Sequence, residues 1–211
     1  EALAATAAAS AELEHLRDAR LPYSLAWLKD LEVLLTAYSA RSQENARRAK
    51  EDLFGVQNSR KVYDGRYAGM LDPGLLAAKR DAEQRLRQAV AARPDLVESV
   101  DAWDRIAEAQ KAMAENTLRY SLLEGRHGLQ GDLFSIARTL VRAAEERPKP
   151  NAERLREFGD AGRESLEFQL FSEKPIYDDL EQLRLADSLS WLVAHLGSAD
   201  PLVQRILAGR S

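Results

Sequence analysis

The placement of glycine and proline constrains the fold of this chain more than any other sequence feature. The 211 residues include only 11 glycines and 7 prolines, and these lie between long segments whose apolar residues recur every three or four positions. That recurrence is typical of amphipathic helices, whereas the period-two alternation of strands is nearly missing. We therefore expect an all-α protein, a single elongated helical domain of about seven to eight helices in an antiparallel, bundle-like arrangement.

The breaks between these segments give the expected helix boundaries. Leu21-Pro22 should end a first helix over residues 2–17, and Ser42 should cap a helix that reaches about Gly69. Asp72-Pro73 should start the next helix, which Arg93-Pro94 closes. The other expected helices cover 24–40, 94–125, 132–147, 151–171, 176–196 and a short stretch from Pro201. We assign 1–20 as an N-terminal helical or junction segment and 21–211 as the main helical domain.

Composition removes several classes of function. A formal charge of −4 gives no general case for binding nucleic acid or an acidic membrane surface. No window approaches the ~18 uninterrupted apolar residues of a membrane span. Cysteine is absent, which excludes disulfides, thiolate metal sites and a cysteine nucleophile. The alanine-rich start lacks the positive region of a signal peptide.

The chemistry-bearing residues are scattered. His15, His127 and His195 have no metal ligand three or four positions away, so we expect no metal site. A glycine loop for phosphate is missing, and so is a glycine-flanked serine of the nucleophile-elbow type. The sequence therefore predicts no cofactor and no hydrolase activity assembled from this chain alone.

One stretch departs from the regular helical pattern. If it is helical, Asn58, Lys61, Gly65 and Gly69 fall at i, i+3, i+7 and i+11, and at roughly 100° per residue they share one narrow stripe. A glycine inside a helix costs about 1 kcal/mol relative to alanine, so two on one stripe need a reason. Either a second helix packs closely there, with Asn58 bonded to a neighbour, or Asn58 faces a ligand that the glycines leave room for.

The same stretch resembles a known family. The resemblance rests on Asn58-Ser59-Arg60-Lys61, Gly65, Gly69-Met70-Leu71-Asp72-Pro73, Leu75-Leu76, Lys79 and Glu83; upstream on Leu21-Pro22-Tyr23-Ser24; and downstream on Trp103-Asp104-Arg105-Ile106-Ala107, Tyr120-Ser121-Leu122-Leu123-Glu124, Leu133-Phe134-Ser135-Ile136-Ala137-Arg138, Lys149-Pro150-Asn151-Ala152-Glu153-Arg154-Leu155 and Pro175-Ile176-Tyr177. In order and spacing these segments resemble the inserted helical domain of the bacterial dipeptidyl-peptidase 7 and 11 family of serine exopeptidases. The likeness spans about residues 20–208.

The resemblance implies a function that the composition does not. In that family a helical cap interrupts a chymotrypsin-like double barrel; the catalytic His and Asp would precede this segment and the nucleophilic Ser would follow it. The expected role is a periplasmic cap that covers the active-site cleft and is inert alone. Its partners would be peptides with a free N-terminus and the barrel of the same polypeptide, with a homodimer of the intact enzyme as an option. Asn58 matches the family's asparagine that helps bind the substrate's α-amino group.

A second reading comes from a different class of protein. The chain could be a free-standing helical scaffold or adaptor that binds a partner helix, with the glycine stripe as a packing seam. The surroundings of Asn58 separate the two readings. A cap should leave Asn58 reachable and should expose apolar surface, whereas a seam should bury Asn58 between helices.

Overall fold

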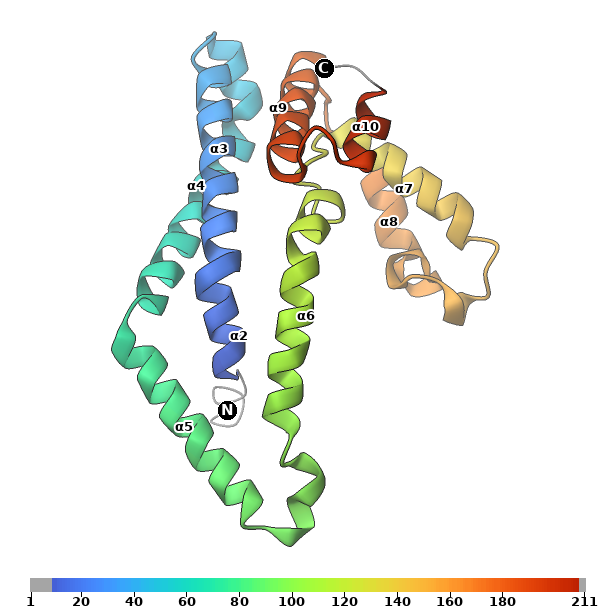
Figure 1. Cartoon of the computed structure of the whole chain (residues 1–211). Coiled ribbons are helices and arrows are strands. Elements are labelled where there is room, and N and C mark those ends of the chain that lie inside the picture. The colour runs from blue at the N-terminus through green and yellow to red at the C-terminus, as the bar shows by residue number, and fades with distance from the viewer. Residues whose placement is uncertain (1–8, 209–211) are drawn as a thin grey trace. The chain divides into compact units, whose positions relative to one another are not determined.

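The computed structural model describes residues 9–208, and within that range every regular element is helical. The α-helices are α2 (Ser10–His15), α3 (Leu21–Ser39), α4 (Gln43–Met70), α5 (Pro73–Ala91), α6 (Ala102–Leu123), α7 (Asp132–Glu146), α8 (Arg163–Leu170), α9 (Asp178–Leu196) and α10 (Pro201–Leu207) (Figure 1). The expectation of an all-α fold is confirmed. The part of the expected first helix that falls on residues 2–8 lies outside the described residues.

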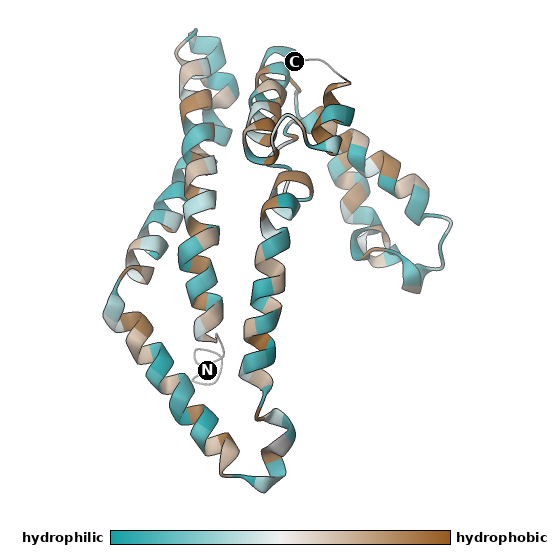
Figure 2. Ribbon diagram, viewed as in Figure 1, coloured by the Kyte–Doolittle hydropathy of each residue, from teal (hydrophilic) through white to brown (hydrophobic). Residues whose placement is uncertain are grey.

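Internal contacts divide the chain into two compact units, residues 1–120 and 121–211, with the division inside α6. Hydrophobic and hydrophilic residues are interspersed along the helices of both units (Figure 2). None of the described helices is long and apolar enough to cross a membrane. The predicted division into 1–20 and 21–211 stays a prediction.

The centre of unit 1 is a hairpin of α3 and α4, which pack side by side along most of α3. α3 buries Leu28, Leu31, Leu35 and Tyr38, a spacing of three, four and three that keeps these side chains on one helix face. Ser42 caps α4 as predicted, since its hydroxyl accepts a hydrogen bond from the backbone N–H of Asn45 at 3.0 Å.

The expected break at Leu21-Pro22 is wrong. The helix runs from α2 into α3 through a π-helical turn, Leu16–Arg20, and the N–H of Leu21 donates to the carbonyl of Leu16, five residues earlier. Proline lacks an N–H and its ring crowds the preceding turn, but a π-turn widens the helix at that point. Leu21 is fully buried, so packing holds the chain helical where local sequence favours a stop.

Two polar links tie α2 to α5 within unit 1. The Glu83 carboxylate accepts hydrogen bonds from the backbone N–H and hydroxyl of Ser10, at 2.8 and 2.6 Å. Arg80 pairs with Glu14. Burial acts to raise the pKa of the Glu83 carboxyl, but the hydrogen bonds from Ser10 and Arg87 outweigh it and lower that pKa.

Unit 2 is organised around the start of α7. Glu181 of α9 is buried, and its carboxylate accepts the backbone N–H groups of Asp132 and Leu133 at 3.0 and 2.8 Å. Gly131 precedes them with φ at +129°, and a Cβ there would lie 2.8 Å from a Glu181 oxygen. A glycine is therefore required at this junction both for its backbone angle and for the close approach of Glu181.

Two expected helices begin later than predicted. Residues 151–162 form three short 3₁₀ turns before α8 starts at Arg163, and Pro94–Ser99 form a 3₁₀ segment before α6. In the first case the Asn151 side chain accepts the N–H of Asp160 at 2.8 Å, which closes a loop rather than a helix. The other predicted boundaries, including Asp72-Pro73 and Pro201, agree with the structure to within a few residues.

Candidate functional site on the outer face of α4

The Asn58 stripe lies on the face of α4 that points away from α3. α4 turns its buried Ala49 toward the hairpin core, and Asn58 is nine residues further on, half a helical revolution away at 100° per residue. Asn58 and Lys61 are exposed, as are Gly65 and Gly69. The predicted common face is therefore real, and it is a surface rather than a helix–helix contact.

The three glycines of α4 border open space. A Cβ added at Gly55, Gly65 or Gly69 would meet no heavy atom within 4 Å outside the local helix backbone. The packing-seam reading predicted a close backbone neighbour at these positions. None is present among the described residues, so within this chain the glycines do not serve close helix packing.

The side chains of Asn58 and Lys61 are also available to bind a ligand. Among residues 9–208 its side-chain amide forms no hydrogen bond, and Lys61, one turn further along, forms no ion pair. An asparagine carbonyl is a good acceptor for an ammonium group, and its NH₂ can donate to a carbonyl. The pair thus presents an acceptor and a cation to whatever approaches this face.

Sequence reasoning missed two neighbours of Asn58. Phe54 and Val62, four residues before and after it, are 65% and 67% exposed. Residues four apart on a helix are surface neighbours, so the amide of Asn58 lies between two large apolar side chains. The spacing was visible in the sequence, but a period of four there also fits a buried stripe, and only the fold shows that it faces outward.

A charge network on the flank holds this part of α4 to α3. Arg60 donates to Glu32 of α3 at 2.6 Å and to Asp64 of its own helix at 2.8 Å. Gln57 reaches the same Glu32 at 3.3 Å. These residues bracket Asn58 in sequence but lie on the side of α4 that meets α3, so they position the helix and leave the outer face open.

The structure does not bring the three histidines together into one ligand set. His127 is half-buried in the α6–α7 connection, and desolvation lowers the pKa of its imidazole from 6.5 to about 4. His195 stacks on Trp191 at 4.3 Å between ring centroids and directs Nδ1 to that residue's carbonyl. In the described part of the chain no three His, Asp or Glu side chains are grouped as metal ligands.

Comparison with known proteins identifies the class as a peptidase. The chain belongs to the Peptidase S46 family, whose model matches residues 5–211. This is the dipeptidyl-peptidase 7 and 11 family, so the resemblance drawn from the sequence is confirmed and the chain has a dipeptidyl-peptidase-related role. A search of the curated proteins and a search of the solved structures each found no match.

Proposed function

We propose that this chain is the helical cap of a serine dipeptidyl-peptidase, and that Asn58 binds the free α-amino group of peptide substrates. The observation that carries the proposal is the position of Asn58: an unbonded amide on an exposed helix face, beside glycines that border open space. Family membership supports a role with peptide substrates. The expected serine chemistry would come from residues outside the helical cap.

The chemistry of the face fits a substrate N-terminus. The side-chain oxygen of Asn58 accepts a charge-assisted hydrogen bond from an ammonium group, an interaction of about 1.5–3 kcal/mol. Phe54 and Val62, exposed apolar side chains one turn before and after Asn58, would shed water when a peptide binds, which strengthens such a bond. Glycines along the stripe leave space for a peptide backbone to approach α4.

Such an anchor explains exopeptidase behaviour physically. A substrate with a free amine satisfies the Asn58 acceptor, whereas an N-blocked or internal segment would leave a desolvated polar group unpaired. Unpaired buried polar groups discriminate strongly between substrates. A periplasmic location for the intact enzyme, and a homodimer, are part of the same proposal and rest on the family resemblance.

The test is the intact enzyme with Asn58→Ala. Losing a hydrogen bond to a charged group should lower kcat/KM for free-amine dipeptidyl substrates by about tenfold to a hundredfold. N-blocked analogues should change little, since they never offered the amine. Asn58→Asp keeps an acceptor and should retain most of the preference for a free amine.

Asn116→Ala is the matched control, because Asn116 is an exposed asparagine whose side chain bonds only its own helix, at Ala112. It should leave both kcat/KM and the free-to-blocked ratio unchanged. A stable Asn58→Ala enzyme with wild-type discrimination would rule out the anchor. If Asn58→Ala instead abolishes binding of a partner helix while sparing catalysis, the adaptor reading replaces it.

A further inference from the structure

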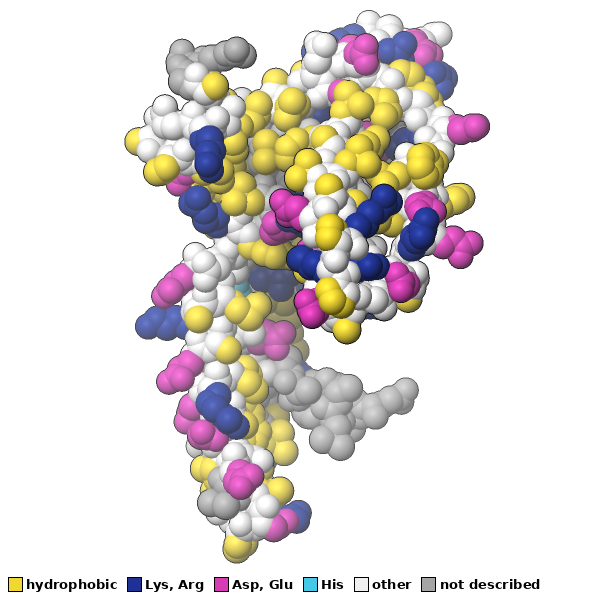
Figure 3. All heavy atoms as spheres, turned by 90° about the vertical axis from the view of Figure 1, so that its right-hand side faces the viewer, with side chains coloured by type: hydrophobic (Ala, Val, Ile, Leu, Met, Phe, Trp, Pro, Cys, Tyr) yellow, Lys and Arg dark blue, Asp and Glu magenta, His cyan; other side chains and the backbone are white. Residues whose placement is uncertain are grey.

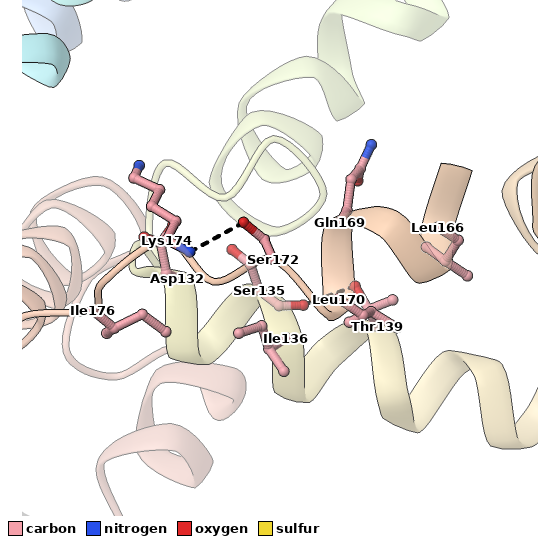
Figure 4. A pocket seen from close by; sticks show the side chains of 10 residues that line it. All are labelled: Asp132, Ser135, Ile136, Thr139, Leu166, Gln169, Leu170, Ser172, Lys174 and Ile176. Atoms are coloured by element: carbon pink, nitrogen blue, oxygen red, sulfur yellow. Dashed lines mark hydrogen bonds between the residues drawn. The ribbon is translucent and has the colours of Figure 1, made fainter. Parts of the chain in front are cut away.

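Unit 2 contains a cavity that the proposed role of α4 does not use. It has a volume of about 250 Å³ and lies between α7, α8 and the segment that leads from α8 to α9 (Figure 4). Its lining residues are Asp132, Ser135, Ile136, Thr139, Leu166, Gln169, Leu170, Ser172, Lys174 and Ile176. The lower limit for drug-sized ligand pockets is about 300 Å³, so this cavity suits a smaller molecule.

Four of the lining residues give the cavity an apolar wall. Ile136 comes from α7, Leu166 and Leu170 from α8, and Ile176 from the segment before α9. The Ser135 hydroxyl donates to the carbonyl of Gly131 at 2.7 Å and accepts from the Arg126 guanidinium, and the Thr139 hydroxyl donates to the carbonyl of Ser135 at 2.8 Å. Neither hydroxyl therefore has a proton left to donate to a ligand. These walls would hold an aliphatic side chain.

The rim carries two opposite charges that form no ion pair with any residue the structure describes. Lys174 and Asp132 form no ion pair among the described residues, with each other or with anything else, although both line the same cavity. In Figure 4 Lys174 and Gln169 rise on either side of Ser172, above Ile136. The Ser172 hydroxyl oxygen accepts the backbone N–H of Lys174 at 3.3 Å, which fixes the segment that carries the lysine.

The start of α7 cannot supply an anion site here, since Glu181 already takes the N–H groups of Asp132 and Leu133. We assign a carboxylate bound at this rim to Lys174, which lines the cavity, rather than to Arg126, whose guanidinium already donates to the hydroxyl of the lining residue Ser135. An ammonium group would be held by Asp132. The two charges and the apolar walls together match a zwitterion with an aliphatic side chain.

We propose that this cavity binds a small apolar zwitterion, either a free aliphatic amino acid or a dipeptide. Its carboxylate pairs with Lys174, its ammonium group with Asp132, and its side chain lies against Ile136 and Leu170. A dipeptide is what a dipeptidyl-peptidase releases, so for the source of that ligand the inference rests on the proposed function. The site itself is separate from Asn58.

Calorimetric titration of the 211-residue chain tests the proposal. Leucyl-leucine should bind saturably, and N-acetyl-leucinamide, which lacks both charges, should not. Lys174→Ala should weaken leucyl-leucine binding about tenfold, the usual effect of losing a charge-assisted contact. Lys174→Arg should restore the affinity for leucyl-leucine. The ligand 4-methylpentanoate has no ammonium group, so Asp132→Asn should leave its affinity unchanged while weakening leucyl-leucine binding.

Lys111→Ala is the control for a change in surface charge, since Lys111 is an exposed lysine of α6 with no ion pair in the described range. It should bind as the unmodified chain does. Leucine as strong as leucyl-leucine would identify a free amino acid as the ligand; weaker leucine would identify the dipeptide. Absence of saturable binding, or binding unchanged in a folded Lys174→Ala chain, would overturn the site.

Asn58→Ala separates this inference from the proposed function. It should leave leucyl-leucine binding to the cavity unchanged, because Asn58 belongs to unit 1 and the cavity to unit 2. The amine selectivity of the intact enzyme tests only the proposed role of Asn58 on α4. A calorimetric titration without saturable leucyl-leucine binding would contradict only the proposed cavity site.

Discussion

His127 is the residue whose environment most changes its chemistry. Burial in the α6–α7 connection lowers the pKa of its imidazole from 6.5 to about 4, because the charged form loses hydration there. The neighbouring Gly128 is also tightly placed, since a Cβ on it would lie 2.8 Å from Leu192. The connection is therefore a packed part of unit 2 and disfavours protonation of His127.

This shift predicts a pH dependence of stability. Between pH 6.5 and about 4 the unfolded chain binds a proton at His127 that the folded chain does not, so the free energy of unfolding falls as pH falls through that window and levels off below it. The full shift would correspond to about 3.4 kcal/mol. Because His127 is only half-buried, we expect about 2 kcal/mol.

The measurement is urea unfolding at pH 7 and pH 4.5 for the native chain and for His127→Gln. The variant carries no titrating group at this position, and pH 4.5 covers about 70% of the titration, so the difference in its unfolding free energy between the two pH values should be smaller by about 1.5 kcal/mol. Equal pH dependence in the two chains would show that His127 is not desolvated in the folded state.

At Asn58 the sequence predicts the position of the residue along its helix, and the tertiary structure decides whether the side chain is exposed. Its place on one stripe with Lys61 follows from helical periodicity, and the structure confirms it. That this stripe faces away from α3 follows from Ala49, which is buried on the opposite side of α4. Tertiary packing therefore decides whether Asn58 is a core group or a surface group.

Among the helices, α7 depends most on a distant partner. Its own preceding residue, Gly131, has no side chain that could cap the first turn, and Glu181 of α9 supplies the missing acceptor from 50 residues away in sequence. The buried carboxylate is in turn satisfied by two backbone N–H groups and by the positive end of the helix.

Glu181→Ala should therefore destabilise unit 2. It removes two hydrogen bonds to a charged group and leaves two helix N–H groups without their acceptor, a loss of about 2 kcal/mol in the free energy of unfolding. Thermal unfolding followed by circular dichroism would show it as a lower Tm. Glu181→Gln keeps one acceptor oxygen and should lose about half as much.

Glu173→Ala is the control, because Glu173 is an exposed glutamate on the segment before α9 with no ion pair among the residues described. Its Tm should match that of the native chain. An unchanged Tm in Glu181→Ala would mean that water or another side chain caps α7 equally well.

At the scale of the whole molecule, the exposed apolar side chains indicate where the chain could contact another protein surface. On the face seen in Figure 3 hydrophobic side chains gather in patches among the charged ones. Phe168 and Phe171, at the end of α8, are 83% and 81% exposed. Exposed apolar surface of this kind marks interaction sites, and the cap role proposed above would use it.

The 211-residue chain should not react with a fluorophosphonate serine probe or hydrolyse dipeptidyl substrates. Its buried Ser188 donates to the carbonyl of Leu185 and accepts the N–H of Gln130, so its hydroxyl has a structural role. Mass spectrometry after incubation with the probe should show unmodified protein. Stoichiometric labelling of a serine in this chain would contradict the cap proposal.

The sequence alone determined the fold class, most helix boundaries and the family. Apolar periodicity and punctuation by glycine, proline and capping residues act locally, so Ser42, Asp72 and Pro201 could be assigned from their neighbours alone. The motif around Asn58 and Lys61 was recognisable for the same reason: its residues are close in sequence.

Tertiary structure alone decided what depends on residues that are distant in sequence. Burial of Leu21 carries the helix past Pro22, Glu181 caps α7, and the α7–α8 cavity assembles from residues 132–176. The exposure of Asn58 belongs to the same class, because it depends on which side of α4 meets α3. Local helix propensities amount to about 1 kcal/mol or less for most residues and about 3 kcal/mol for proline, and packing energies of several kcal/mol override them where the two conflict.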